Sequence, residues 1–238
     1  MTSFVLKIIA MITMFCDHFG YAFMGHFSYF NYIGRIAFPI FAFQISEGFI
    51  HTKNLKKYFM RLLLFAVISQ IPFYLFLQKF MPNTVGELNI FFTLLLGLLS
   101  IVVYDYFSKV ENQELNYGVF GIPFKNLIGT MFAFFIAYIG ELLKVDYGLW
   151  GIIVIFAFYL FKNNKLAMII SYITLCVMRY GVNILLYGFH VEYIYLALAT
   201  ISPILLIWLY NGKQGYHKIK YFLYLFYPLH LLLLYLFM

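Results

Sequence analysis

Long, nearly charge-free apolar stretches constrain the fold of this chain more than any other feature. They are residues 4–16, 58–77, 90–104, 127–140, 149–161, 193–210 and 221–238. About 20 apolar residues let an α-helix cross a bilayer, and most of these stretches reach that length with their uncharged polar flanks. Only 11% of the residues are charged, against about 25% in a soluble globular domain. The sequence therefore predicts an integral membrane protein.

We predict an all-α fold, namely a polytopic transmembrane helical bundle of about nine helices. The longest polar segment, residues 105–125, is too short for a soluble domain, so residues 1–238 are expected to form a single transmembrane domain. The expected helices cover residues 4–24, 31–50, 58–78, 89–107, 123–142, 147–162, 165–186, 191–210 and 219–237.

The distribution of Lys and Arg predicts how the bundle is oriented. Membrane proteins carry an excess of these residues in their cytoplasmic loops. With nine helices and a cytoplasmic N-terminus, the outer side carries only Lys79 and Lys144. The cytoplasmic side then carries Lys7, Lys53, Lys56, Lys57, Arg61, Lys109, Lys125, Lys162, Lys165, Lys213, Lys218 and Lys220. This asymmetry favours a cytoplasmic N-terminus.

The formal net charge of +7 has the same explanation. Basic residues at the cytoplasmic ends of helices are attracted to anionic lipid, so we expect the lipid bilayer, and not nucleic acid, as the partner. Cys16 and Cys176 both fall within expected spans. Neither cysteine makes a metal site alone, and we expect no metal.

Ionisable residues inside spans are costly, and they usually pair or line a cavity. In this chain they are Asp17, His18, Arg35, Glu47, Arg179 and His230, with Asp146 and Asn89 at the starts of spans. All of them except Glu47 fall in the outer half of the predicted bundle. We therefore expect a hydrated cavity open to the outer face or close to it.

Asp17 and His18 cannot share one role, because neighbours on a helix point about 100° apart. We expect Asp17 to pair with Arg35 and His18 to face the cavity. His18 is then either a general base for an incoming amine or hydroxyl, or part of a proton relay. The alternative is structural: a buried ion pair that fixes helix packing, with His230 as a hydrogen-bonded core histidine.

The segment 34–49 is the densest polar cluster, and Pro39 is expected to bend its helix. Glu47, near its cytoplasmic end, is expected to pair with Arg61 or with a lysine of the next loop. The basic loop 51–57 is either a positive-inside anchor or an attractor for an anionic ligand. The loop 211–215 is either a simple turn or a site where backbone N–H groups meet phosphate.

Motifs along nearly the whole chain resemble the TraX family of bacterial membrane proteins. They are Leu6-Lys7-Ile8-Ile9-Ala10, Met14, Asp17-His18, Gly34-Arg35, Phe38-Pro39, Phe41, Glu47-Gly48, Thr52, Tyr58, Arg61-Leu62, Ser69-Gln70-Ile71-Pro72-Phe73, Leu88-Asn89, Thr93, Asp146-Tyr147-Gly148, Gly151, Asn211-Gly212, Tyr221-Phe222, Tyr224, Tyr227-Pro228 and His230. The family is associated with acetylation of conjugative pilin. The resemblance implies a multi-pass protein of the bacterial cytoplasmic (inner) membrane.

A wider resemblance is to the type-3 membrane acyltransferases, which carry a basic residue, ten intervening residues and then a histidine. Lys7 and His18 have this spacing, with lysine where that family more often has arginine. The resemblance implies that acetyl-CoA, the acyl donor, approaches from the cytoplasm. The N- or O-acetylated acceptor would be a peptide such as a pilin, a glycan or a lipid, either extracytoplasmic or embedded in the membrane.

These inferences give three groups of candidate residues. The expected catalytic residues are the base His18 with its supporting residues Asp17, Arg35 and His230. Residues expected to bind the acceptor substrate are Asn89, Asp146, Tyr147, Arg179 and Glu47, and one of Arg35, Arg179 or Asn89 is expected to stabilise the oxyanion. Residues expected to bind acyl-CoA are Lys7, Lys53, Arg61 and Lys213.

Two other functions fit the same residues. A proton-coupled transporter or permease also needs Asp, His and Arg inside the membrane, although no inverted repeat is visible in the sequence. A non-enzymatic assembly factor of a membrane complex is the third function. Turnover of acetyl-CoA distinguishes an acyltransferase from the transporter and from the assembly factor.

Overall fold

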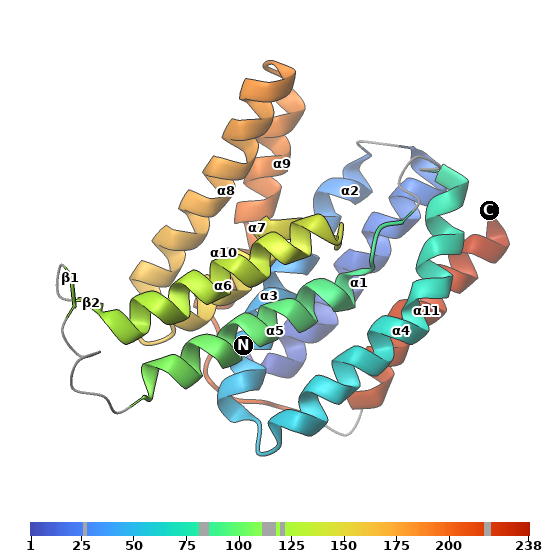
Figure 1. Ribbon diagram of the computed structural model, residues 1–238. Coiled ribbons are helices and arrows are strands. Elements are labelled where there is room, and N and C mark those ends of the chain that lie inside the picture. The colour runs from blue at the N-terminus through green and yellow to red at the C-terminus, as the bar shows by residue number, and fades with distance from the viewer. Residues whose placement is uncertain (26–27, 81–85, 111–117, 120–121, 217–219) are drawn as a thin grey trace.

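Apolar helices make up nearly all of the computed structural model, which describes residues 1–25, 28–80, 86–110, 118–119, 122–216 and 220–238 (Figure 1). The elements are α1 (Ser3–Phe19), η1 (Gly20–Met24), α2 (Tyr29–Gly34), α3 (Ala37–His51), α4 (Leu55–Phe80), α5 (Ile90–Ser108), β1 (Gly118–Val119), β2 (Ile122–Pro123), α6 (Phe124–Leu142), α7 (Gly148–Leu160), α8 (Lys165–Tyr187), α9 (Val191–Ile201), α10 (Pro203–Trp208) and α11 (Lys220–Phe237). The two short strands pair antiparallel.

The predicted all-α fold is confirmed. Within the described part of the chain, six helical stretches are long and apolar enough to cross a membrane. They are residues 3–24, 29–51, 55–79, 90–108, 165–187 and 191–208. Residue 219, the expected start of the last helix, and Lys218 lie outside the described residues.

Two of the expected helices are interrupted, and a proline explains each interruption. The helix expected over 31–50 ends at Gly34, and α3 begins at Ala37. Pro39 has no N–H to bond the carbonyl of Arg35, four residues earlier, so the chain breaks there. Pro39 then sits in the first turn of α3, where a proline is tolerated, so it interrupts the expected helix at residues 35–36. Pro203 likewise begins α10 and separates it from α9.

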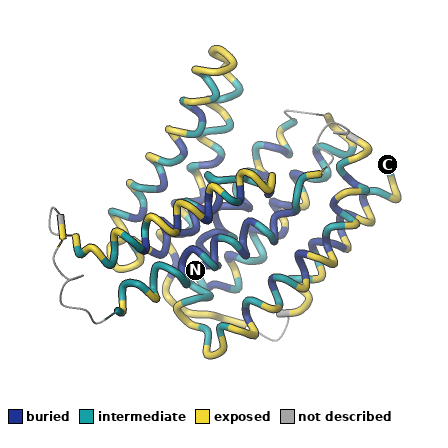
Figure 2. Tube along the Cα trace, viewed as in Figure 1, coloured by how far each residue is buried: buried dark blue, intermediate teal, exposed yellow. Residues whose placement is uncertain are grey.

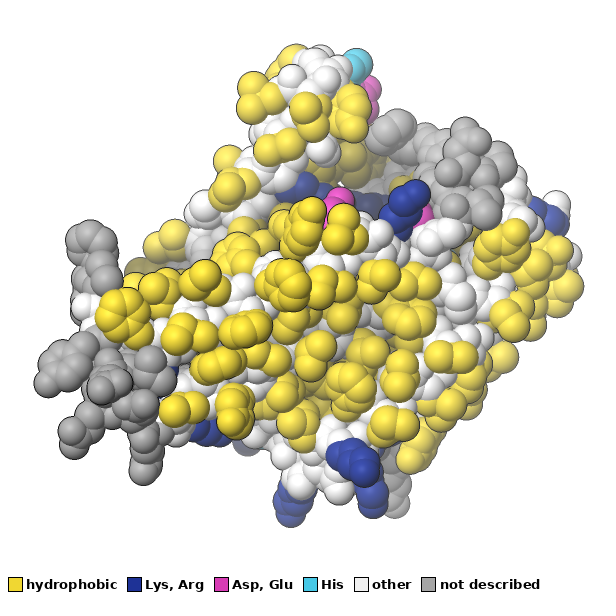
Figure 3. Space-filling model, in the orientation of Figure 1, with side chains coloured by type: hydrophobic (Ala, Val, Ile, Leu, Met, Phe, Trp, Pro, Cys, Tyr) yellow, Lys and Arg dark blue, Asp and Glu magenta, His cyan; other side chains and the backbone are white. Residues whose placement is uncertain are grey.

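The core of the bundle lies where α1, α3, α5 and α7 pack together, and buried residues concentrate along these helices (Figure 2). Helices α4 and α11 pack against each other beside this core. Helices α8 and α9 form a hairpin that projects from the bundle and is mostly exposed (Figures 1 and 2). Hydrophobic side chains cover most of the face of the bundle that Figure 3 shows, as expected for contact with lipid.

The two ends of the bundle differ in charge. We call the end that holds the N-terminus and the loops 52–54, 162–164 and 209–216 the basic end, because most of the Lys residues expected in the cytoplasm gather there. The N-terminal strand is tied to this end, because Ser3 N donates to Lys213 O at 2.9 Å and Phe4 N to Gln214 O at 3.0 Å. The opposite end holds the turns before α5 and before α7, which pair at Leu88 and Val145.

Candidate functional site

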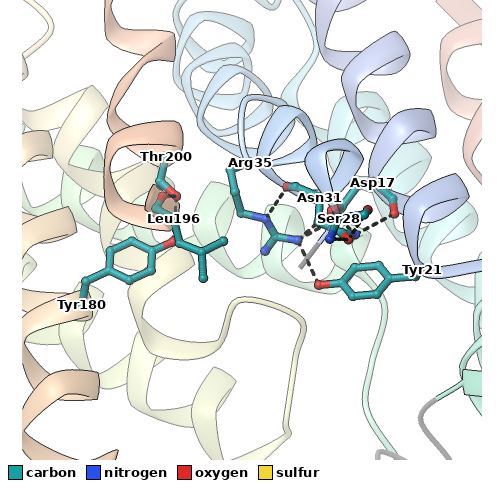
Figure 4. A network of polar contacts seen from close by, with 8 residues as sticks. All are labelled: Asp17, Tyr21, Ser28, Asn31, Arg35, Tyr180, Leu196 and Thr200. Atoms are coloured by element: carbon teal, nitrogen blue, oxygen red, sulfur yellow. Dashed lines mark hydrogen bonds and ion pairs between the residues drawn. The ribbon is translucent and has the colours of Figure 1, made fainter. Parts of the chain in front are cut away.

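An ion pair joins α1 to the end of α2, as the sequence predicted. Nη2 of Arg35 lies 2.8 Å from Oδ1 and 2.9 Å from Oδ2 of Asp17, and the carboxylate is buried. Asn31 donates from Nδ2 to the Asp17 backbone oxygen at 3.1 Å, and Tyr21 Oη accepts from Arg35 at 3.3 Å. Figure 4 shows Arg35 lying between this network and the Tyr180 side chain of α8. The hydrogen bonds satisfy charges that would otherwise be costly to bury.

Two glycines allow α1 and α2 to approach closely enough for this pair. A Cβ on Gly34 would lie 2.2 Å from Cβ of Asp17. A Cβ on Gly20 would lie 2.7 Å from Oγ of Ser28. Gly20 also begins the π-helical turn η1 after α1, and such turns are frequent at functional sites. The local sequence therefore brings Asp17 and Arg35 together.

His18, which we expected to face an outer cavity, pairs with His230 of α11. Nδ1 of His18 lies 2.7 Å from Nε2 of His230, and the two rings stack with centroids 4.9 Å apart. Nδ1 of His230 lies 2.7 Å from the carbonyl oxygen of Phe226. Because a carbonyl only accepts, His230 carries its proton on Nδ1, and Nε2 of a neutral His230 must accept from His18. Nε2 of His18 therefore keeps a lone pair.

Near Asp17 and Arg35, the turn between α6 and α7 adds a second group of polar residues. Tyr147 has a left-handed backbone (φ 64) and stacks on Phe38 with centroids 3.9 Å apart. The guanidinium of Arg179 lies 4.4 Å from the ring centroid of Trp150 and 5.6 Å from that of Tyr147. A left-handed non-glycine residue persists only where its surroundings hold it. Packing on Phe38 therefore fixes the place of Tyr147.

Asp146, in the same turn, interacts electrostatically with Arg35 and Arg179. Removal from water raises the pKa of its carboxyl to about 7; Arg35 and Arg179 lower that pKa, and Glu87 raises it further. The structure thus gathers Asp17, Arg35, Asp146 and Arg179 near the opposite end of the bundle, as the sequence predicted, and places Tyr147 beside them. Figure 3 shows basic and acidic side chains in the hollow beside the α8–α9 hairpin.

A cavity of about 400 Å³ lies in the other half of the bundle, between α1, α3, α4, α5 and α11. We call it the basic-end cavity. Its α1 lining consists of Ser3, Lys7 and Met14, and the last α11 residue that lines it is Tyr227. Side chains three or four residues apart share a face of a helix. His18 and His230 therefore lie one turn beyond the inner end of this cavity.

Unpartnered polar atoms surround the basic-end cavity. Among the described residues, Gln44 Nε2, Arg61 Nε and the Tyr227 hydroxyl are buried without a hydrogen-bond partner, and all three residues line the cavity. Gln44 is held from its other end, because its Oε1 accepts from Ser3 Oγ at 2.6 Å. Buried polar groups are nearly always hydrogen-bonded. A polar ligand in the cavity would satisfy these donors.

The expected donor-binding residues divide into two groups. Lys7 and Arg61 line the basic-end cavity, as do exposed His51, Gln214 and Tyr216 at its mouth. Lys53 and Lys213 are exposed at the basic end, next to lining residues Thr52 and Gln214 but outside the lining itself. The structure therefore brings only Lys7 and Arg61 of the expected donor-binding residues to the cavity.

Two expected substrate-binding residues have other partners. Glu47 was expected to pair with Arg61 or a loop lysine, but its Oε2 lies 3.7 Å from His51 Nδ1 and its carboxylate bonds the Tyr210 hydroxyl. Asn89 caps α5: its Oδ1 accepts from Phe91 N at 3.0 Å. Its Nδ2 donates to Ala66 O at 2.7 Å and to Gln70 Oε1 at 2.8 Å. Both amide hydrogens of Asn89 are thus used within the protein, and a role in substrate binding stays a prediction.

Comparison with known proteins places this chain in a family. The TraX protein family matches residues 3–238. The chain belongs to the TraX family. It is also 30% identical over 255 residues to a probable fimbrial assembly protein, FimC of serogroup H1, from Dichelobacter nodosus, with 98% of this chain and 94% of that protein covered. No solved structure matches the chain.

Three residues that sequence reasoning missed complete the site of this TraX-family chain. Asn31 and Tyr21 hold the Asp17–Arg35 pair, and Gln44 lines the basic-end cavity. Gln44 stood within the polar segment 34–49, and its position three residues before Glu47 was the available signal. Tyr21, one tyrosine among 22 in the chain, carried no comparable signal.

Proposed function

We propose that this TraX-family protein is a membrane-embedded acetyltransferase. It takes an acetyl group from acetyl-CoA at the basic end and transfers it to an amine or hydroxyl of an acceptor embedded in the membrane or exposed at the opposite end. One observation carries the proposal: the basic-end cavity is lined by unpartnered donors and leads toward the His18–His230 pair.

The basic end is proposed to face the cytoplasm, where CoA thioesters are made. The excess of Lys and Arg at this end supports that orientation. The protein would then be a multi-pass protein of the bacterial cytoplasmic membrane. The acceptor would reach the same histidine pair from the membrane or from the outer side.

The residues of the basic-end cavity suit the donor. Lys7 and Arg61 supply positive charge for phosphate groups, and Arg61 is the residue type that binds phosphate with two parallel hydrogen bonds. Gln44 offers an amide N–H to the amide-containing arm of CoA. The distance from Lys7 to His18 along α1 is roughly 16 Å at about 1.5 Å per residue. A long, flexible thioester arm can span such a distance, whereas a small metabolite cannot.

The histidine pair suits general base catalysis. With Nδ1 of His18 donating to His230, Nε2 of His18 carries the lone pair that can accept a proton from the acceptor. A correctly positioned general base contributes about 10²–10⁴-fold to rate. Bound acetyl-CoA supplies the activated acyl group. Asp17 and Arg35 hold α2 against α1 and so fix the position of His18, the neighbour of Asp17.

The similarity to a probable fimbrial assembly protein supports a protein acceptor that is assembled at the cell surface. Such a subunit passes through the membrane before assembly and would present an amine or hydroxyl there. The alternative acceptor is a glycan or a lipid. Whether the labelled product is a protein, a glycan or a lipid distinguishes the three.

The test is transfer of labelled acetyl from acetyl-CoA in membranes that contain the protein. The wild type should bind acetyl-CoA and label an acceptor, and Lys7→Gln should weaken binding. Lys53→Gln is the matched control, because Lys53 is equally basic but lies outside the cavity lining. Equal weakening by the two substitutions, or transport of a solute by vesicles without any acetyl transfer, would contradict the proposal.

A further inference from the structure

Tyr227 of α11 occupies an unusual position between the basic-end cavity and the histidine pair. Its side chain is only 3% exposed and lines the inner end of the cavity. Its ring centroid lies 6.1 Å from that of His18 and 5.7 Å from that of His230. Tyr227 is therefore in contact both with the space where a ligand fits and with the proposed base.

The hydroxyl of Tyr227 is buried without a hydrogen-bond partner of normal geometry among the described residues. The backbone N–H of Ile90, the first residue of α5, faces the Tyr227 oxygen without completing such a bond. The start of a helix carries a partial positive charge. An N–H directed at a phenol oxygen also strengthens the hydrogen bond that the phenol itself donates.

The other groups expected to stabilise an oxyanion are already engaged. Arg35 binds Asp17, Tyr21 and Asn31. Arg179 lies on the ring of Trp150, and the side chain of Asn89 is saturated. The remaining unpartnered donors of the cavity, on Gln44 and Arg61, belong to its basic half.

We propose that Tyr227 is a catalytic residue. Its hydroxyl donates a hydrogen bond to the thioester carbonyl oxygen in the transition state and keeps its proton. This inference rests on the proposed acetyl-CoA-dependent function and adds a residue to its chemistry. It also explains why a buried hydroxyl has no hydrogen-bond partner among the described residues, an arrangement that is otherwise costly.

The step is balanced as follows. The acceptor nitrogen or oxygen attacks the thioester carbon while Nε2 of His18 takes its proton. The carbonyl oxygen becomes an oxyanion and accepts the hydrogen bond from Tyr227. The C–S bond then breaks, the carbonyl forms again, and the CoA thiolate takes the proton from His18. The products are the acetylated acceptor and CoA with a free thiol, and neither oxidant nor metal is consumed.

The test compares Tyr227→Phe with the wild type in acetyl transfer and in acetyl-CoA binding. The phenylalanine keeps the ring contacts with His18 and Phe91 and removes only the hydroxyl. We expect kcat to fall about 10²–10³-fold, the range found for removal of one oxyanion donor. The Kd for acetyl-CoA should stay within about twofold, because a transition-state contact does not stabilise the bound substrate.

Thermal stability is a second measurement, and it distinguishes a catalytic role of the Tyr227 hydroxyl from a structural one. Tyr227→Phe should leave thermal stability unchanged or slightly higher, since the lost hydroxyl had no partner. Tyr172→Phe is the matched control. It removes a buried hydroxyl of α8 that donates to the backbone oxygen of Thr200 in α9. That control should lower stability and leave kcat of the folded protein unchanged.

The outcomes separate the two proposals. If the wild type binds no acetyl-CoA and transfers no acetyl group, the proposed function fails and this inference with it. The role of Tyr227 is wrong, while the proposed function stands, if the wild type transfers acetyl and Tyr227→Phe keeps kcat within about threefold. The same holds if the substitution weakens acetyl-CoA binding by the same factor as it lowers kcat/KM.

Discussion

His18 and His230 are 212 positions apart in the sequence, yet Nδ1 of one lies 2.7 Å from Nε2 of the other. The pair joins α1 to α11, two helices that meet beside the basic-end cavity. The hydrogen bond from His230 to the Phe226 carbonyl sets the tautomers of both rings. His230 therefore acts as the positioning residue for the proposed base, and this role can be tested by mutation.

Replacing His230 should impair turnover without weakening donor binding. His230→Leu removes the acceptor for the Nδ1 proton of His18, so the His18 tautomer is no longer fixed and kcat should fall at least about 10-fold. His18→Ala should be worse, about 10²-fold or more, because it removes the base itself. The measurement is kcat and KM for acetyl-CoA in reconstituted vesicles.

His230→Gln distinguishes positioning from packing. The amide oxygen of glutamine accepts a hydrogen bond from His18 but does not reproduce the imidazole ring. We expect His230→Gln to recover part of the kcat that His230→Leu loses, with the same KM. Equal activity in the two variants would contradict the positioning role.

The Asp17–Arg35 ion pair should show strong coupling in a double-mutant cycle. Arg35→Met leaves the buried carboxylate of Asp17 without its cation, which typically costs about 3–5 kcal/mol of unfolding free energy. Asp17→Asn in the same molecule removes that charge, so the double variant should be less destabilised than Arg35→Met alone. The free energies come from reversible denaturation in lipid–detergent micelles. Additive effects would mean that the two groups do not interact.

Gly34→Ala should destabilise the protein, because the added Cβ would lie 2.2 Å from Cβ of Asp17. Overpacking of this kind typically costs about 1–3 kcal/mol. Gly181→Ala is the matched control, since Gly181 lies within α8 and a Cβ there meets nothing within 4 Å. The control should be neutral or stabilising by up to about 1 kcal/mol, because alanine favours helix more than glycine does. Comparable destabilisation by both changes would contradict close approach at Gly34.

The helices could be predicted from the sequence because a span has a required length and composition. The helix expected over 165–186, for example, is α8 at Lys165–Tyr187. The Asp17–Arg35 pair could also be predicted from the sequence, because the two residues belong to consecutive expected spans and fall at similar depth in the predicted bundle. The break before Pro39 required tertiary detail, since the sequence located the proline but not which residue would lose its helical conformation.

The His18–His230 pair and Tyr227 show what the sequence did not reveal. Hydropathy and charge predict where helices start and end, but they do not determine which of several helices are neighbours. Helix α11 packs on α4 and contacts α1, and this packing alone brings His230 to His18. The family motif Tyr227-Pro228 marked this tyrosine in the sequence, but it did not show that the hydroxyl lacks a partner among the described residues, which depends on that packing.

The buried carboxyl of Asp146 should make the stability of the folded protein fall as pH rises. Burial raises the pKa of its carboxyl from 3.8 to about 7, and the turn that holds it lies outside α6 and α7. Between these two values the folded protein keeps the Asp146 proton while the unfolded chain releases it. Because the folded state then binds more protons, the contribution of Asp146 to stability falls as pH rises from about 4 to about 7 and stays low above that.

Asp146→Asn removes this titration and should therefore stabilise the protein at pH 8 relative to the wild type, with a smaller effect at pH 5. A difference of about 1 kcal/mol corresponds to about 2–4 °C in Tm for a chain of this size. The measurement is Tm of both proteins in the same detergent at the two pH values. The pH dependence, and not the absolute Tm, is decisive, because the amide also changes contacts with Arg35 and Arg179 at every pH. A Tm difference that is equal at pH 5 and pH 8, or larger at pH 5, would show that Asp146 ionises in the folded protein as it does in the unfolded chain.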